Sequence, residues 1–197
     1  MYLAHHAPHW PLHALPEDIE RYSGQYSRGW DQLRGARYEE LRHRGVLQHP
    51  WALSPRDPEA PAWDNARHQS WEAQRMAVYA AQVDRMDQQI GRVLQTLKRL
   101  GKYDDTLVLF FSDNGGCAEA MREGGWTQFY PDKTRDGRQI VLGNRPDLAP
   151  GGATTFQSYD LPWVSTQYSY DNCYEHTYSS CDPSATSASS CVPTCYS

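Results

Sequence analysis

A short polar turn directly after an apolar run contains the two side chains best suited to bind a metal ion. The turn is Ser112-Asp113-Asn114-Gly115-Gly116, and it follows the apolar residues 106–111. Open α/β sheets bind ligands beyond the carboxyl ends of their strands, so Asp113 and Asn114 would lie at a functional edge. A carboxylate and an amide oxygen suit a hard divalent cation such as Ca²⁺ or Mg²⁺. A simple turn is the alternative, because Asn-Gly is among the commonest turn dipeptides.

Histidines near the start of the chain form a second group with possible chemistry. They occur in the sequence His5-His6-Ala7-Pro8-His9. An imidazole can act as an acid or base, donate a hydrogen bond to an anion, or bind a metal, although a solvated side chain is the ordinary case. His9 is the most promising of the three, because Pro8 and Pro11 stiffen its backbone and Trp10 gives it an apolar neighbour.

The elements that would position these groups are two helices and two strands. Apolar residues recur at three- and four-residue steps over residues 69–100, which predicts a long amphipathic helix closed by Gly101. A shorter helix is predicted over residues 30–44 and closed by Gly45. Residues 106–112 are continuously apolar and rich in aromatic residues, which is typical of a strand buried on both faces.

Residues 1–4 resemble the last half of a further strand, and the proline-rich residues 50–63 and the residues 115–162 are predicted to be irregular. A helix followed by a buried strand indicates an α/β fold with a mostly parallel sheet flanked by helices.

Composition divides the chain into a body, residues 1–164, and a tail, residues 165–197. The tail has no Lys, Arg, Leu, Ile, Phe or Met, so we expect it to be disordered or aberrant. Four cysteines lie in it, and they could form disulfides in a secreted protein or remain reduced thiols: Cys173, Cys181, Cys191 and Cys195.

The formal charge and the apolar pattern exclude two classes of function. The chain carries 24 acidic against 19 basic side chains, for a formal net charge of −5, so we expect no nucleic-acid partner. The apolar residues occur in short runs, which predicts no membrane span. The first residues lack the pattern of a secretory signal.

Taken together, the motifs of residues 1–163 resemble those of the sulfatase family, the formylglycine-dependent sulfuric ester hydrolases of the alkaline-phosphatase-like superfamily. The order and spacing of the matching segments make this resemblance specific. They are Ala7-Pro8-His9-Trp10-Pro11-Leu12, Tyr22-Ser23-Gly24-Gln25-Tyr26 with Gly29-Trp30-Asp31 and Arg37, the helix containing residues 79–91, the turn at residues 112–116, and Phe156-Gln157-Ser158-Tyr159 with Leu161-Pro162-Trp163.

The resemblance implies a partial alkaline-phosphatase-like sandwich, with roles for three residues. Asp113 and Asn114 correspond to ligands of the family's Ca²⁺, with Mg²⁺ the less favoured ion, and His9 corresponds to the histidine that contacts the sulfate ester. The implied substrate is a sulfated small molecule or carbohydrate. Family members are often secreted, periplasmic or lysosomal, and the localisation of this protein is left open.

Two parts of the family's site do not occur in these 197 residues. They are the Cys-x-Pro-Ser/Thr-x-Arg segment that yields formylglycine, with its paired aspartates, and the lysine-bearing stretch expected after Trp163. Cys191-Val192-Pro193-Thr194 imitates the first segment, but no arginine follows it, and we treat Cys117 as an ordinary small residue. We therefore expect a fragment truncated at both ends, inactive alone and poorly soluble. The alternatives are a related metal-dependent phosphodiesterase or phosphatase, or a non-catalytic remnant.

Overall fold

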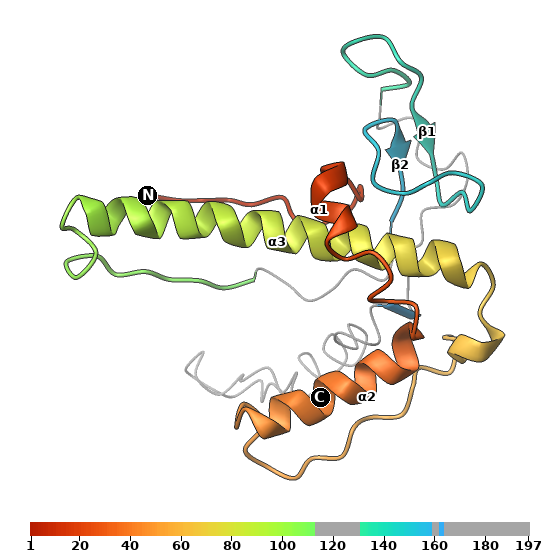
Figure 1. Cartoon of the computed structure of the whole chain (residues 1–197), viewed down its shortest axis with the longest axis horizontal. Helices are drawn as coiled ribbons and strands as arrows, with labels where there is room; N and C mark the ends of the chain where they lie inside the picture. Colours follow the sequence, from red (N-terminus) through yellow and green to blue (C-terminus); the bar gives the residue numbers. More distant parts are fainter. Residues whose placement is uncertain (113–130, 159–161, 164–197) are drawn as a thin grey trace, which may run out of the picture. The chain divides into compact units, whose positions relative to one another are not determined.

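The computed structural model describes residues 1–112, 131–158 and 162–163. The chain divides into two compact units. The described part of the first unit comprises residues 1–27, 68–112 and 131–158, and that of the second comprises residues 28–67 and 162–163. The first unit contains helices α1 (Pro16–Glu20) and α3 (Gln69–Arg99) with strands β1 (Val141–Leu142) and β2 (Thr155–Phe156), and the second contains α2 (Gly29–His43) with a 3₁₀ turn, Trp63–Asn65 (Figure 1).

Helix α3 confirms the prediction of a long amphipathic helix over residues 69–100. Its first half carries the buried apolar side chains Met76, Ala77, Val78 and Ala81. The helix ends in a Schellman motif, in which Gly101 N donates to Lys98 O at 3.0 Å and Lys102 N donates to Leu97 O at 2.9 Å. Gly101 has φ +63°, a conformation in which glycine avoids the clash of a Cβ atom.

Helix α2 confirms the second predicted helix and ends in the same way, with Gly45 N donating to Arg42 O at 3.0 Å. Close to its start, the indole rings of Trp30, Trp63 and Trp163 pack edge to face, with centroids 4.7 and 5.3 Å from Trp30 to the other two. Trp30 and Trp163 are almost fully buried, so these rings form the core of the second unit. The proline-rich connection is irregular up to Ala62, as predicted.

Strands β1 and β2 pair in parallel, with Val141 opposite Thr155 and Leu142 opposite Phe156. The helices and this parallel pair agree with an α/β class. Among the described residues the sheet has these two strands alone, so the larger, mostly parallel sheet is not seen there.

The prediction of a buried strand at residues 106–112 was wrong for this structure. The segment has no regular strand structure, and Leu107, Phe110 and Phe111 are 84%, 76% and 76% exposed. Residues 1–4, predicted to end another strand, are also irregular and exposed. A strand that is apolar on both faces needs neighbouring strands and covering layers, and in the described part of the chain no strand pairs with either segment.

No helix in the described part of the chain is long and apolar enough to cross a membrane. Residues 164–197, which include the whole predicted tail and its four cysteines, lie outside the described residues, so the predicted tail stays a prediction.

Candidate functional site

His9 lies on an exposed turn just before a firmly held segment. Its backbone N–H donates to His6 O at 3.0 Å, and its ring lies 5.5 Å from that of His6 and 5.0 Å from that of Trp10. The ring atom Nδ1 is 2.7 Å from Trp10 O. A carbonyl oxygen can only accept, so Nδ1 carries a proton. The opposite atom, Nε2, therefore accepts in the neutral ring and donates when the ring is doubly protonated.

The residues after His9 are fixed to the segment around β2. Leu12 is fully buried, and its N–H donates to Gln157 O at 2.9 Å. Ala14 N donates to Gly151 O at 3.3 Å, next to a parallel bridge between His13 and Gly151. These bonds place the His9 turn beside residues 151–157, two segments that are distant in sequence.

His13 adds a side-chain bond to the same junction. Its Nε2–H donates to Thr155 O at 2.9 Å, and its ring meets the ring of Phe156 edge on at 5.2 Å. Burial lowers the pKa of His13, because desolvation disfavours the charged ring, and the bond to Thr155 O opposes this only in part. His13 is therefore held mainly as a neutral ring at neutral pH, with a structural hydrogen bond.

Helix α3 also contacts this junction. Gln82 Nε2 lies 3.4 Å from Pro11 O, a long hydrogen bond two residues after His9. Further along the junction, Gly151 approaches α3 so closely that an added Cβ atom would lie 2.9 Å from a Val78 methyl group. The segment that follows His9 thus lies between the β2 region and α3.

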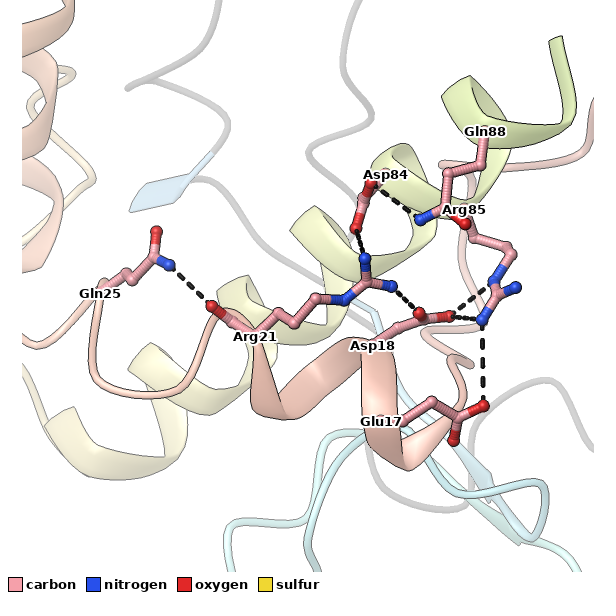
Figure 2. Close-up of polar contacts among 7 residues, drawn as sticks. All are labelled: Glu17, Asp18, Arg21, Gln25, Asp84, Arg85 and Gln88. Carbon is pink, nitrogen blue, oxygen red and sulfur yellow. Dashed lines mark hydrogen bonds and ion pairs between the residues drawn. The ribbon is translucent and has the colours of Figure 1, made fainter. Parts of the chain in front are cut away.

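An ionic network fixes α1, the helix that continues from this segment, to α3 (Figure 2). The Asp18 side chain is 0% exposed and accepts from Arg85 Nε at 2.7 Å and Nη2 at 2.6 Å. It also accepts from Arg21, the residue directly after α1, whose other nitrogen lies 3.1 Å from Asp84 Oδ2. Burial raises the pKa of Asp18, but the hydrogen bonds from Arg85 and Arg21 lower it by more, so the net shift is downward.

The first part of the predicted Phe156–Trp163 motif is held by α3 as well. The buried guanidinium of Arg75 donates to Ser158 O, pairs with Glu72, and lies 4.2 Å over the Trp71 ring. Asn144 makes two hydrogen bonds to Ser158. Its Oδ1 atom accepts from the Ser158 backbone N–H at 2.8 Å, and its Nδ2 atom donates to the Ser158 hydroxyl at 3.2 Å. The position of Ser158 is therefore fixed from two sides.

Of the three predicted site residues, the structure places one. His9 is described, whereas Asp113 and Asn114 lie outside the described residues, so the structure does not report whether the three come together. Within the described ranges no group of three or more His, Cys, Asp or Glu side chains could hold a metal ion.

Sequence reasoning did not find the residues that fix the His9 segment. These are mainly polar side chains that become buried or half-buried only through contacts between distant parts of the chain: Asp18, Arg75, Gln82, Arg85 and Gln157. An available signal was the short stretch Pro16-Glu17-Asp18, a proline followed by acidic residues, which is typical of a helix start.

Comparison with known proteins gives the family. Residues 1–141 match the family model named Sulfatase, which is more than half of the chain. The chain belongs to the sulfatase family, whose fold is the alkaline-phosphatase-like α/β fold.

Individual relatives support this assignment. The chain is 40% identical over 117 residues to an uncharacterized sulfatase of Schizosaccharomyces pombe, a match that covers 58% of this chain and 21% of the relative. It is 37% identical over 116 residues to an arylsulfatase of Klebsiella aerogenes, covering 58% of this chain and 25% of that enzyme. The matches therefore span about a fifth to a quarter of the length of these two relatives.

Proposed function

We propose that this chain is part of a sulfuric ester hydrolase of the arylsulfatase type, in which His9 contacts the sulfate ester and Asp113 with Asn114 binds a divalent cation, Ca²⁺ before Mg²⁺. The observation that carries the proposal is the family match over residues 1–141, which includes all three residues. The whole protein would hydrolyse the sulfate ester of a small molecule or carbohydrate.

The geometry of His9 supports the role given to it. The bond from Nδ1 to Trp10 O leaves Nε2 as the atom that can meet a substrate. Negative charge develops on the ester oxygen as the sulfate bond breaks, and a doubly protonated His9 would donate a hydrogen bond to that oxygen from Nε2. Trp10, which is 5% exposed, and Leu12 anchor the backbone and so keep the ring at a defined place.

The donor set of Asp113 and Asn114 fits a hard cation, because both offer oxygen ligands. Such a cation, when bound, would polarise the sulfate oxygens. No cysteine of this sequence lies in the pattern that conversion to formylglycine needs, so the residues of this chain do not supply that nucleophile. We therefore expect no turnover by this chain alone.

A titration followed by NMR tests the proposal on the chain as it exists. In the presence of Ca²⁺, 4-nitrophenyl sulfate should shift the imidazole signals of His9, and it should do so less in the Asp113→Ala variant. 4-Nitrophenyl phosphate should cause smaller shifts at equal concentration. Larger shifts with the phosphate ester would favour a phosphatase or phosphodiesterase instead. Shifts that are equal in Asp113→Ala, or turnover by this chain, would contradict the proposal.

A further inference from the structure

Two exposed histidines near the start of the first unit lie close enough together to share one metal ion. The ring centroids of His6 and His9 are 5.5 Å apart, and the ring planes are inclined at 44°. Both side chains are exposed to solvent. The backbone of the turn fixes the spacing of the two residues, because the N–H of His9 donates to the carbonyl oxygen of His6 at 3.0 Å. The pair is therefore local to one turn and accessible to an ion in solution.

The separation of the two rings fits two ligands of the same ion. Zinc lies about 2.0–2.1 Å from the imidazole nitrogen that binds it, and its ligands are arranged tetrahedrally. This geometry places the centroids of two rings on the same ion about 5 Å apart. The observed separation of 5.5 Å is close to that value, so small rotations of the two side chains would bring one nitrogen of each ring to the ion.

The tautomer of His9 also fits a metal ligand. Its Nδ1–H donates to Trp10 O at 2.7 Å, which leaves the lone pair of the neutral ring on Nε2. A histidine that binds a metal almost always donates its other ring N–H, often to a backbone carbonyl, because this bond fixes the tautomer and orients the ring. Within the described ranges the His6 ring has no hydrogen-bond or ion-pair partner, so it can turn toward the same ion.

The ligand type of this pair selects the ion. Imidazole nitrogen suits Zn²⁺, whereas Ca²⁺ and Mg²⁺ prefer oxygen ligands. The pair therefore differs in kind from the oxygen ligands proposed at Asp113 and Asn114. Since no group of three or more His, Cys, Asp or Glu ligands occurs in the described ranges, water would fill the other positions around the ion. Such an ion exchanges with solution and is not a permanent part of the fold.

We propose that His6 and His9 bind Zn²⁺ through one nitrogen of each ring, with Nε2 as the ligand atom of His9. The inference goes beyond the proposed function and does not rest on it, because neither Asp113 nor Asn114 takes part. Nε2 of His9 is also the atom that the proposed function assigns to the sulfate ester. If the ester binds there, Zn²⁺ on the pair competes with it for the same atom.

A Zn²⁺ titration of the purified chain, followed by NMR, tests this site. The chain contains five cysteines, which are alkylated first because thiolates also bind Zn²⁺. We expect Zn²⁺ to shift the imidazole signals of His6 and His9 together, with one dissociation constant, and to leave those of His13 in place. His6→Gln should weaken binding at His9 at least about tenfold, the smallest loss usually found even for residues that only orient a metal ligand.

His5→Gln is the matched control, because it removes the neighbouring exposed histidine and should leave the dissociation constant of Zn²⁺ nearly unchanged. The imidazole signal of His13, which bonds Thr155 O, reports whether each variant keeps its fold. Equal weakening by His5→Gln and His6→Gln would overturn the inference. So would binding at His9 that is as tight in His6→Gln as in the natural chain.

Asp113→Ala separates this inference from the proposed function. Zn²⁺ should bind His6 and His9 equally well in that variant, and loss of binding there would overturn the inference, because the ion would then depend on the oxygen ligands. Competition between Zn²⁺ and 4-nitrophenyl sulfate at His9 is expected only if the proposed function also holds. Binding of Zn²⁺ to the pair without any such competition would support the Zn²⁺ site and count against the proposed function.

Discussion

Asp18 of α1 is fully buried and bonded by two nitrogen atoms of Arg85 of α3, at 2.7 and 2.6 Å. The pair joins two residues that are 67 positions apart in the sequence. A five-residue helix is too short to be stable by itself. We infer that the pair fixes α1, and with it the end of the segment that begins at His9.

Replacing Asp18 with Asn should destabilise the first unit by about 2 kcal/mol, because two arginines lose their charged partner. This cost is below that of breaking a fully buried pair, because the side chains of Arg21 and Arg85 are 49% and 36% exposed and water partly solvates them. Urea unfolding measures this change. The control is Asp136→Asn, which breaks an exposed pair with Arg138 and should change the unfolding free energy far less than Asp18→Asn does.

The effect of Asp18→Asn on the unfolding free energy should depend on pH. The pKa of Asp18 is lowered in the folded chain, so its charged form contributes stability above the ordinary carboxyl pKa of about 3.9. That contribution is lost as the pH falls through the folded-state pKa. The difference in unfolding free energy between the natural chain and Asp18→Asn should stay at about 2 kcal/mol between pH 5 and 8. It should shrink below about pH 4. A difference that grows toward acid pH would contradict the assignment.

His13 should make the chain less stable in mild acid. Its pKa lies below the ordinary value of 6.5, so the unfolded chain binds a proton more readily than the folded one. Stability is complete above about pH 6.5 and declines as the pH falls from there toward the lowered pKa. His13→Gln, which keeps a donor for Thr155 O, should remove this part of the pH dependence in thermal unfolding. The exposed His43→Gln should leave it in place, and identical profiles for both variants would refute the prediction.

Gly151 should not tolerate a side chain. An added Cβ atom would lie 2.8 Å from Ile19 Cδ1 and 2.9 Å from Val78 Cγ2, where α1, α3 and the β2 region meet. Gly151→Ala should therefore cost about 1–3 kcal/mol more than Gly137→Ala. Gly137 also has a positive φ but has open space around it, so it controls for backbone strain alone. If chemical denaturation showed the same loss of unfolding free energy for both variants, the close packing at Gly151 would not contribute to stability.

The sequence predicted the local elements well and the sheet poorly, for a physical reason. Both long helices and their glycine ends follow from apolar periodicity and backbone preferences within a few residues, and both were found. Residues 106–112 have the composition of a strand, but a strand exists only where partners pair with it, and the described residues provide none. The two-residue strands β1 and β2 and the short helix α1 are too brief to leave a periodic signal.

For the candidate site, the sequence indicated residue types but not the contacts between distant residues. His9 was predicted as a site residue from its type and surroundings, and that role stays a prediction; its tautomer depends on a carbonyl contact that the sequence does not reveal. The burial of Asp18 depends on Arg85, and the fixing of Ser158 depends on Arg75 and Asn144. Contacts of this kind, between residues far apart in the chain, were not predictable from patterns in a single sequence.

The exposed segment at residues 107–111 should control solubility. Contiguous exposed apolar side chains promote association, and all five residues are at least 49% exposed. Phe110→Lys should increase the soluble concentration by about twofold or more and reduce light scattering, because it adds a charge to the patch. Gln95→Lys adds the same charge on the exposed surface of α3 and should have little effect. If both variants behaved alike, net charge alone would explain solubility.

The central claim, that His9 and Asp113 share a site for a divalent cation, can be measured most directly with Mn²⁺ as a paramagnetic substitute. Mn²⁺ prefers the same oxygen ligands as Ca²⁺ and Mg²⁺ and broadens the NMR signals of nearby nuclei. We predict that substoichiometric Mn²⁺ broadens the imidazole signals of His9 before those of His13. Asp113→Ala should abolish this broadening, and Asp104→Ala, which removes an exposed carboxylate outside the predicted site, should not. Broadening of His9 that persists unchanged in Asp113→Ala, or that never appears, would contradict the account.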